Sequence, residues 1–183
     1  YLLDGRVNSL RCSTRPDYID AEVIGILKKY GMSTIELGIQ SMSDKVLSLC
    51  SRGHTSAHSE NACKLIKESG ISLVGQMMTG LPGSEPSDER YTAMRLCMAH
   101  VDAVRIYPTM VFAGTGLEEM MRDGRYVPPD EEDTIDRVAD LIEFFDANSV
   151  PIIRIGLCSG TELATDTGIV AGGYEPAIGD MAS

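Results

Sequence analysis

Several features common in other protein classes are missing from this sequence. No stretch reaches the roughly 18 consecutive apolar residues that a membrane-spanning helix needs, and the first residues lack the composition of a signal peptide. The five cysteines are odd in number, and no two of them have the CxxC spacing of a zinc or redox site. These absences argue against a membrane protein and indicate reduced thiols in a cytoplasmic protein.

An excess of basic residues is also missing. The chain has 16 Lys and Arg against 27 Asp and Glu, which gives a net charge of -11. Because non-specific binding to nucleic acid depends on neutralising phosphates, this charge argues against a general nucleic-acid surface. It leaves room for a local basic groove completed by residues outside this sequence. The 183 residues, 43% hydrophobic and 23% charged, have the composition of one globular domain or a large part of one.

Strand and helix patterns alternate along the chain, joined by short connections. Apolar runs predict strands over 7–13, 34–39, 71–78, 103–109 and 151–157. Helical periodicity predicts helices that begin near Asp20, Ser43 and Thr55 and others over 88–100, 117–121 and 130–145. Strands that alternate with helices form parallel βαβ units with right-handed crossovers.

Such units form either a flat doubly wound sheet or a barrel. A dinucleotide-binding sheet of the Rossmann type carries G-x-G-x-x-G after its first strand, whereas this chain has Arg15-Pro16-Asp17 there. The sequence therefore favours an α/β fold with a partial parallel barrel of the TIM type.

The predicted strands end in polar residues that could hold a ligand. In a parallel α/β barrel, ligands bind at the carboxyl ends of the strands. The residues at or near these ends are Ser13, Gln40, Ser41, Gln76, Arg105 and Tyr107, and Arg52 follows Gln40 after one predicted helix. Amides, hydroxyls and guanidinium groups suit binding by hydrogen bonds better than proton transfer or metal ligation.

Simpler interpretations exist for single members of this set. Gln40 could cap a loop, and Arg52 could interact with the carbonyls at the end of its own helix. Gln76 is harder to explain in this way, because a buried amide costs free energy unless it is paired. His54 and His58 are four residues apart but straddle a predicted helix start, so we do not expect them to form a metal pair.

Considered together, these segments resemble a known family. TIELGIQS, the Arg52-Gly53-His54-Thr55 segment, GQMMTGLPG and VRIYPT are similar to segments of the radical S-adenosylmethionine (SAM) enzymes. The resemblance is to the branch that contains the catalytic subunit of elongator and its bacterial relatives, with oxygen-independent coproporphyrinogen oxidase as a more distant cousin. PIIRIGL and VAGGYEPAIGDM resemble the C-terminal extension of the elongator-like bacterial proteins.

The resemblance implies roles for individual residues. In coproporphyrinogen oxidase-like enzymes, the glutamine matching Gln40 contacts the ribose of SAM, and the arginine matching Arg52 pairs with its methionine carboxylate. Gln76 matches a ribose-contacting aspartate, and Ser13 stands where the cousins often have a glutamate. Ser41, Arg105 and Tyr107 complete the expected SAM-binding set.

One family feature is absent from this chain. Radical SAM enzymes bind a [4Fe-4S] cluster through CxxxCxxC, a motif that this sequence does not contain. We therefore expect residues 1–147 to be the C-terminal two-thirds of the barrel, with about four of its six strands, and 148–183 to be an extension. The cluster cysteines would then precede Tyr1, this chain alone would be inactive, and its first strand would be an unpaired edge open to self-association.

The intact parent is expected to cleave SAM reductively to methionine and a 5′-deoxyadenosyl radical. The elongator-like branch implies a tRNA substrate and coproporphyrinogen oxidase implies a porphyrinogen, so oxidoreductase and transferase chemistry both stay open. The alternative is a cluster-free α/β domain that binds a nucleotide or a protein partner. A conventional barrel lyase or aldolase would need a Schiff-base lysine at a strand end, but Lys28, Lys29, Lys45, Lys64 and Lys67 all fall on predicted helices.

Overall fold

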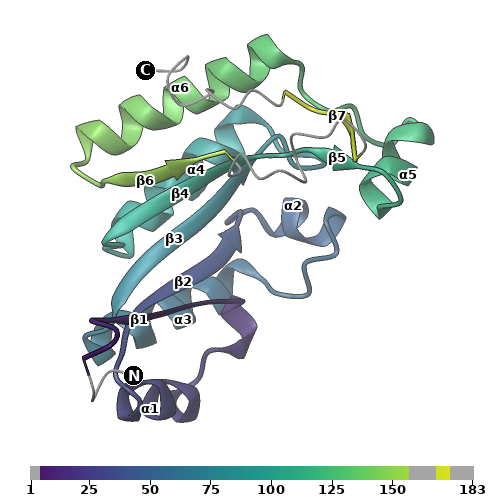
Figure 1. The fold of residues 1–183 in the computed structure, drawn as a ribbon. Helices are drawn as coiled ribbons and strands as arrows, with labels where there is room; N and C mark the ends of the chain where they lie inside the picture. Colours follow the sequence, from purple (N-terminus) through teal and green to yellow (C-terminus); the bar gives the residue numbers. More distant parts are fainter. Residues whose placement is uncertain (1–4, 157–167, 174–183) are drawn as a thin grey trace.

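A five-stranded parallel sheet forms the centre of the protein. The computed structural model describes residues 5–156 and 168–173, and Figure 1 shows the course of the chain. The strand order in the sheet is β1-β2-β3-β4-β6. The bounds of these strands are β1 Leu10–Thr14, β2 Met32–Gln40, β3 Ser72–Thr79, β4 Ala103–Pro108 and β6 Ile152–Ile155. All four pairings between neighbouring strands are parallel, which confirms the predicted βαβ organisation.

Helices connect the strands and begin at recognisable caps. They are η1 Pro16–Tyr18, α1 Ala21–Lys29, α2 Asp44–Leu49, α3 Ser56–Ser69, α4 Pro86–Met98, α5 Gly116–Arg122 and α6 Glu131–Ala147. Asp20 caps α1 as predicted, because its carboxylate accepts a hydrogen bond from Val23 N at 2.8 Å. Ser43 occupies the N-cap position of α2, but its side chain makes no capping hydrogen bond.

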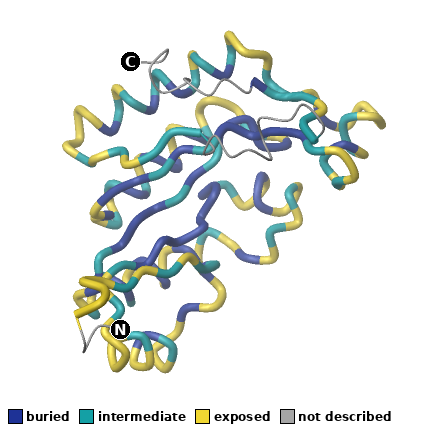
Figure 2. The backbone as a smooth tube through the Cα atoms, in the orientation of Figure 1, coloured by how far each residue is buried: buried dark blue, intermediate teal, exposed yellow. Residues whose placement is uncertain are grey.

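The core lies between the sheet and its helices. Alternate residues of the central strands, including Ile35, Leu37, Ile39, Leu73 and Ile106, are fully buried in one apolar cluster with residues of α3, α4 and α6. Figure 2 shows these strands as the buried centre of the molecule. Because side chains alternate across a strand, the intervening residues of the same strands face the opposite side of the sheet.

Several element boundaries differ from the sequence prediction. The first strand begins at Leu10 rather than Val7, since Leu10 is paired with Met32, the first residue of β2, and Val7 lies before that register. The second strand extends through Gln40. Helix α4 begins at Pro86, two residues earlier than predicted, because proline is well suited to the first turn of a helix.

The C-terminal part contributes more to the sheet than expected. Strand β6 pairs with β4 and is the fifth parallel strand, whereas we expected about four strands in the barrel. Two short segments, β5 (Val111–Phe112) and β7 (Ile169–Ala171), form a separate antiparallel pair that the sequence did not predict. Runs of two or three residues are too short for a periodic pattern. The division at 147/148 stays a prediction, and most of the glycine-rich tail lies outside the described residues.

Two further features concern the edge of the sheet and the length of the apolar helices. Strand β1 lies at the edge of the five-stranded sheet and is paired there with β2. Self-association through this edge stays a prediction. Among the described residues, none of the helices is long and apolar enough to cross a membrane.

Candidate functional site

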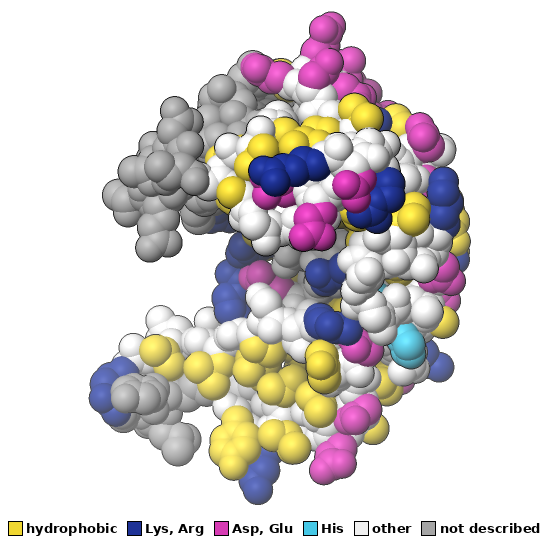
Figure 3. All heavy atoms as spheres, turned by 90° about the vertical axis from the view of Figure 1, so that its right-hand side faces the viewer, with side chains coloured by type: hydrophobic (Ala, Val, Ile, Leu, Met, Phe, Trp, Pro, Cys, Tyr) yellow, Lys and Arg dark blue, Asp and Glu magenta, His cyan; other side chains and the backbone are white. Residues whose placement is uncertain are grey.

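The sheet face opposite the helices is polar and carries most of the predicted site residues. Ser13 of β1 is in register with Glu36 of β2, and Gln76 of β3 is in register with Gly38 and with Arg105 of β4. Figure 3 shows a hollowed molecule with Lys or Arg side chains and an acidic side chain inside the hollow. The structure therefore brings polar residues from four consecutive strands onto one concave surface.

Gln40 ends β2 in an unusual backbone conformation. Its φ is +66°, a left-handed value that costs a non-glycine residue roughly 1–2 kcal/mol. The register between β2 and β3 shifts at this point, and Ser41 N turns back to donate to Ile39 O at 2.8 Å. Gln40 is only 6% exposed, and its Oε1 has no hydrogen-bond partner among the described residues. A buried amide with a strained backbone and an oxygen that accepts no hydrogen bond is typical of a ligand-binding position.

Arg52 approaches the same point from the loop between α2 and α3. Its backbone N–H donates to Leu47 O at 3.0 Å, which fixes the loop to the end of α2. The Nε atom of Arg52 is buried and also has no partner within the described part of the chain. Burial and the nearby charge of Arg15 lower the pKa of the Arg52 guanidinium. An anionic ligand would offset both unfavourable effects.

Gly38 lies directly beneath these two side chains. A Cβ atom at this position would lie 3.2 Å from Gln40 Nε2, 3.5 Å from Thr14 O and 3.8 Å from Arg52 Nη2. The amide and the guanidinium, twelve residues apart in sequence, thus converge over a residue without a side chain. This cradle could receive a small group that carries both hydroxyl and carboxylate oxygens.

His54 fixes the Arg52 loop to the end of β2. Its Nε2 lies 3.1 Å from Ile39 O, and the buried Nδ1 has no partner among the described residues. His58 has a different role, because its Nδ1 accepts a hydrogen bond from Thr55 N in the capping box of α3. The structure therefore gives the two histidines separate structural contacts.

Glu36 is a member of the polar face that the sequence analysis did not single out. Its buried carboxylate lies 3.1 Å from Arg105 Nη2, accepts a hydrogen bond from Ser13 Oγ at 3.2 Å and also pairs with Arg11. Arg105 in turn donates to Tyr107 Oη at 3.2 Å. Glu36 thus links the predicted residues Ser13, Arg105 and Tyr107. The signal was present in TIELGIQ, where Glu36, Gly38 and Gln40 alternate with three buried aliphatic residues.

Ser41 contributes to the turn after β2. Its hydroxyl oxygen accepts a hydrogen bond from Ser43 N at 3.1 Å, and the residue is buried. Gln76 is half-buried at the centre of β3, between Gly38 and Arg105 in the register. Ser41 thus supports the position of Gln40, while Gln76 extends the polar face toward β4.

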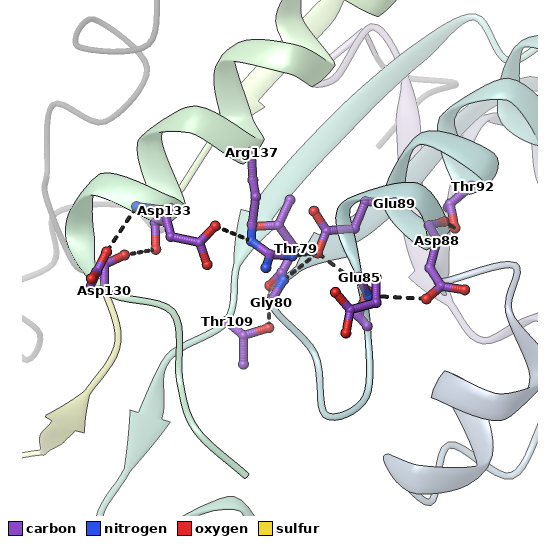
Figure 4. A network of polar contacts seen from close by, with 12 residues as sticks. Thr79, Gly80, Glu85, Asp88, Glu89, Thr92, Thr109, Asp130, Asp133 and Arg137 are labelled. Carbon is purple, nitrogen blue, oxygen red and sulfur yellow. Dashed lines mark hydrogen bonds and ion pairs between the residues drawn. The ribbon is translucent and has the colours of Figure 1, made fainter.

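The turn that follows β3 lies at the same end of the sheet. Figure 4 shows Gly80, at the start of this turn, beside Glu89 of α4 and Arg137 of α6. A polar cavity of about 410 Å³ adjoins the turn and is lined by residues that include Gly83, Ser84, Tyr126 and Arg137. The turn is therefore held by long-range side-chain contacts in addition to its own glycines.

The parallel barrel-like sheet, with polar residues gathered on its concave face, defines the chain as an α/β protein of the barrel type. The Radical SAM superfamily model matches residues 3–96, and the Radical SAM C-terminal domain model matches residues 101–183. The chain belongs to the radical SAM superfamily.

Individual relatives narrow the resemblance. The chain is 34% identical over 137 residues to the tRNA uridine(34) acetyltransferase of Methanocaldococcus jannaschii, a match that covers 73% of this chain and 25% of that protein. The structure of Elp3 from Methanocaldococcus infernus superposes with a TM-score of 0.84 at 30% identity, over 95% of this chain and 40% of that one. The chain spans less than half the length of the curated relatives it matches. These matches confirm the elongator-like resemblance.

A more distant structure supports the barrel. Coproporphyrinogen III oxidase (HemN) from Escherichia coli, a radical SAM enzyme, matches 76% of this chain and 32% of its own length. The TM-score is 0.63 at 16% identity, which shows a shared fold. Together with the Elp3 match, it confirms that the five-stranded sheet is part of a radical SAM barrel.

Proposed function

We propose that this chain forms the part of a radical SAM enzyme that binds the ribose and the methionine carboxylate of SAM. Gln40 and Gln76 would contact the ribose hydroxyls, and Arg52 would pair with the carboxylate. Ser13, Ser41, Arg105 and Tyr107 would complete the polar surface around the ligand. SAM together with a [4Fe-4S] cluster supplies radical chemistry in this superfamily, and the cluster would be held by residues outside this sequence.

The observation that carries this proposal is the pair of buried polar atoms, Gln40 Oε1 and Arg52 Nε, that belong to the two side chains meeting over Gly38. Gln40 Oε1 can accept from a ribose hydroxyl, and the Arg52 guanidinium can donate to a carboxylate. Gln40 Oε1 and the Nε atom of Arg52 are both buried without partners among the described residues. Leaving a buried polar atom unpaired costs about 1–3 kcal/mol, so a ligand that satisfies both atoms gains affinity from each of them.

The substrate of the whole protein is proposed to be tRNA. The curated relatives include two proteins of Methanocaldococcus, each 34% identical to this chain, that are named tRNA uridine(34) acetyltransferase. The likeness to coproporphyrinogen oxidase is at 16% identity and concerns the fold, so a porphyrinogen has less support. We also propose a cytoplasmic location, in agreement with a tRNA substrate and with the reduced thiols expected from the sequence.

The test uses the full-length protein that contains this sequence, purified without oxygen. SAM binding is measured by calorimetry, and 5′-deoxyadenosine is quantified after reduction with dithionite. We expect Arg52→Ala to weaken SAM binding about thirtyfold, equivalent to about 2 kcal/mol for a lost charge-assisted contact. Arg122→Ala, at a largely exposed arginine of α5, is the matched control and should bind SAM normally.

Each outcome leads to a distinct conclusion. If Arg52→Ala and the unmodified protein had equal affinity for SAM, Arg52 would not bind the methionine carboxylate. A full-length protein that binds neither SAM nor iron and sulfide would favour a cluster-free domain for nucleotides or protein partners. Mass spectrometry of tRNA incubated with the active enzyme tests the substrate, and unchanged uridines would contradict it.

A further inference from the structure

Two buried side chains contact the backbone N–H and C=O groups of Gly80. Gly80 N donates to Glu89 Oε1 at 2.7 Å, and Gly80 O accepts from the hydroxyl of Tyr126 at 2.7 Å. Glu89 is 3% exposed and Tyr126 is 6% exposed. Glu89 lies on α4, whereas Tyr126 comes from the segment between α5 and α6. Helix α4 and the segment between α5 and α6 therefore both contact the backbone of one glycine.

The Glu89 carboxylate is itself fixed in place. Its Oε1 also accepts from Arg137 Nη1 at 3.0 Å and from Ser84 Oγ at 3.3 Å, and Arg137 Nε donates to Asp133 at 2.9 Å. Figure 4 shows Glu89 and Arg137 beside Gly80, with Asp133 next to Arg137. Three donors thus converge on one oxygen, which fixes the orientation of the carboxylate relative to the turn.

The strand end before Gly80 is equally constrained. Thr79 O accepts from both the backbone N–H of Thr109, at 2.9 Å, and its hydroxyl, at 2.6 Å. Gly80 has a φ of +69°, and a Cβ atom there would lie 2.6 Å from Pro129 Cγ. Only glycine fits this position, which explains the glycine of the turn.

Stability alone is a poor explanation for this arrangement. Burying a carboxylate is expensive, and a buried ion pair often contributes no more than apolar residues of similar volume. The Oε2 atom of Glu89 is buried without a partner among the described residues, so the network is only partly satisfied. What the network does provide is a fixed orientation of the two peptide units that flank Gly80.

The position of Gly80 relates this turn to the ligand site. Met77, three residues before Gly80, is in register with Gln40. The turn from Gly80 to Gly83 therefore continues β3 at the end of the sheet where Gln40 and Arg52 converge. We propose that Glu89 and Tyr126 are positioning residues that fix this turn beside the SAM site. This inference rests on the proposed function for its ligand.

The experiment combines two variants with two measurements. Glu89→Gln removes the charge, and Tyr126→Phe removes only the hydroxyl. Amide hydrogen exchange of residues 80–84 is measured without ligand, and SAM affinity is measured by calorimetry on the full-length protein well below its unfolding temperature. Glu68→Gln and Tyr30→Phe, at exposed positions, are the matched controls.

We expect faster exchange in the turn for both variants and unchanged exchange in the core strand β2. SAM affinity should fall about threefold to tenfold, as expected when one hydrogen bond that holds a site is lost. Because both side chains hold the backbone of the same residue, Gly80, the double variant should lose less affinity than the sum of the single losses.

The outcomes separate this inference from the proposed function. Unchanged exchange in both variants would overturn the inference, whether or not SAM binds. Faster exchange with unchanged SAM affinity would also overturn it, because the turn would then be held for stability alone. If the unmodified protein failed to bind SAM, the proposed function would fall and the positioning of a SAM site with it, whatever the exchange showed.

Discussion

The side chains of Gln40 and Arg52 meet above Gly38. A Cβ atom on Gly38 would lie 3.2 Å from Gln40 Nε2 and 3.8 Å from Arg52 Nη2. The strand that ends in Gln40 and the loop that carries Arg52 are held together by His54, whose Nε2 contacts Ile39 O at 3.1 Å. The space between the two polar side chains is thus set by the backbone and by one buried histidine.

A methyl group added at Gly38 should weaken ligand binding without unfolding the protein. Gly38→Ala adds a methyl group whose tightest contact is the end of a flexible side chain, Gln40 Nε2. We expect SAM affinity to fall about tenfold, equivalent to about 1.4 kcal/mol, because Gln40 must move away from its position. Calorimetry of the full-length protein measures the affinity, and an unchanged value would show that the ligand does not use this cradle.

A methyl group added at Gly25, which has open space around it, should stabilise the protein. Gly25 lies inside helix α1, and a Cβ atom there would have no neighbour within 4 Å. We expect Gly25→Ala to raise the free energy of unfolding by about 0.5–1 kcal/mol, since alanine loses less conformational entropy in a helix. Urea unfolding measures this change. A loss of stability would indicate that α1 is packed more closely than the structure describes.

The order of strands and helices could be predicted from the sequence because each long element has a clear period. In β2 the apolar residues Ile35, Leu37 and Ile39 alternate with polar or small ones, and the structure buries those three against the helices. The pair β5 and β7 could not be predicted, because its pairing joins residues far apart in sequence. Such pairing depends on the tertiary fold.

The candidate site was predictable in part. Gln40, Gln76 and Arg105 could be grouped from the sequence because the carboxyl ends of parallel strands lie at the same end of the sheet. Glu36 was missed because it lies in mid-strand, where its ion pair with Arg105 depends on the register between strands. Glu89 and Tyr126 were also missed, since they contact Gly80 across nine and 46 residues of sequence. Contacts of this kind have no local signal.

Glu36 should be important for the polar face itself. Glu36→Gln removes the negative charge that faces Arg105 and Arg11 and presents amide hydrogens to their donors. We expect the free energy of unfolding to fall by about 1–3 kcal/mol, as for a buried hydrogen-bonded group that loses its partner. Glu60→Gln, at a more exposed ion pair with Arg95, is the control and should cost less than about 0.5 kcal/mol. Equal losses in urea unfolding would contradict this role.

His54 should make stability depend on pH. Burial lowers the pKa of its imidazole from the ordinary 6.5, and the nearby charges of Arg52 and Arg15 lower it further, while the contact with Ile39 O and the charge of Asp17 oppose this. The unfolded chain therefore binds a proton more readily than the folded protein, so this contribution to stability is fully present above the unfolded pKa and is lost as pH falls through the lower folded value.

The matched variant for this effect is His54→Gln, whose amide Nε2 can still donate to Ile39 O but does not titrate. We expect the unmodified protein to lose more stability than this variant when the pH falls from about 7.5 to about 5.5. Over this range a histidine with the ordinary pKa gains its proton. Urea unfolding of both proteins at several pH values measures the difference. A difference that did not change with pH would mean that His54 takes up its proton as easily in the folded protein as in the unfolded chain. The imidazole could then not be the neutral group that holds the Arg52 loop against β2.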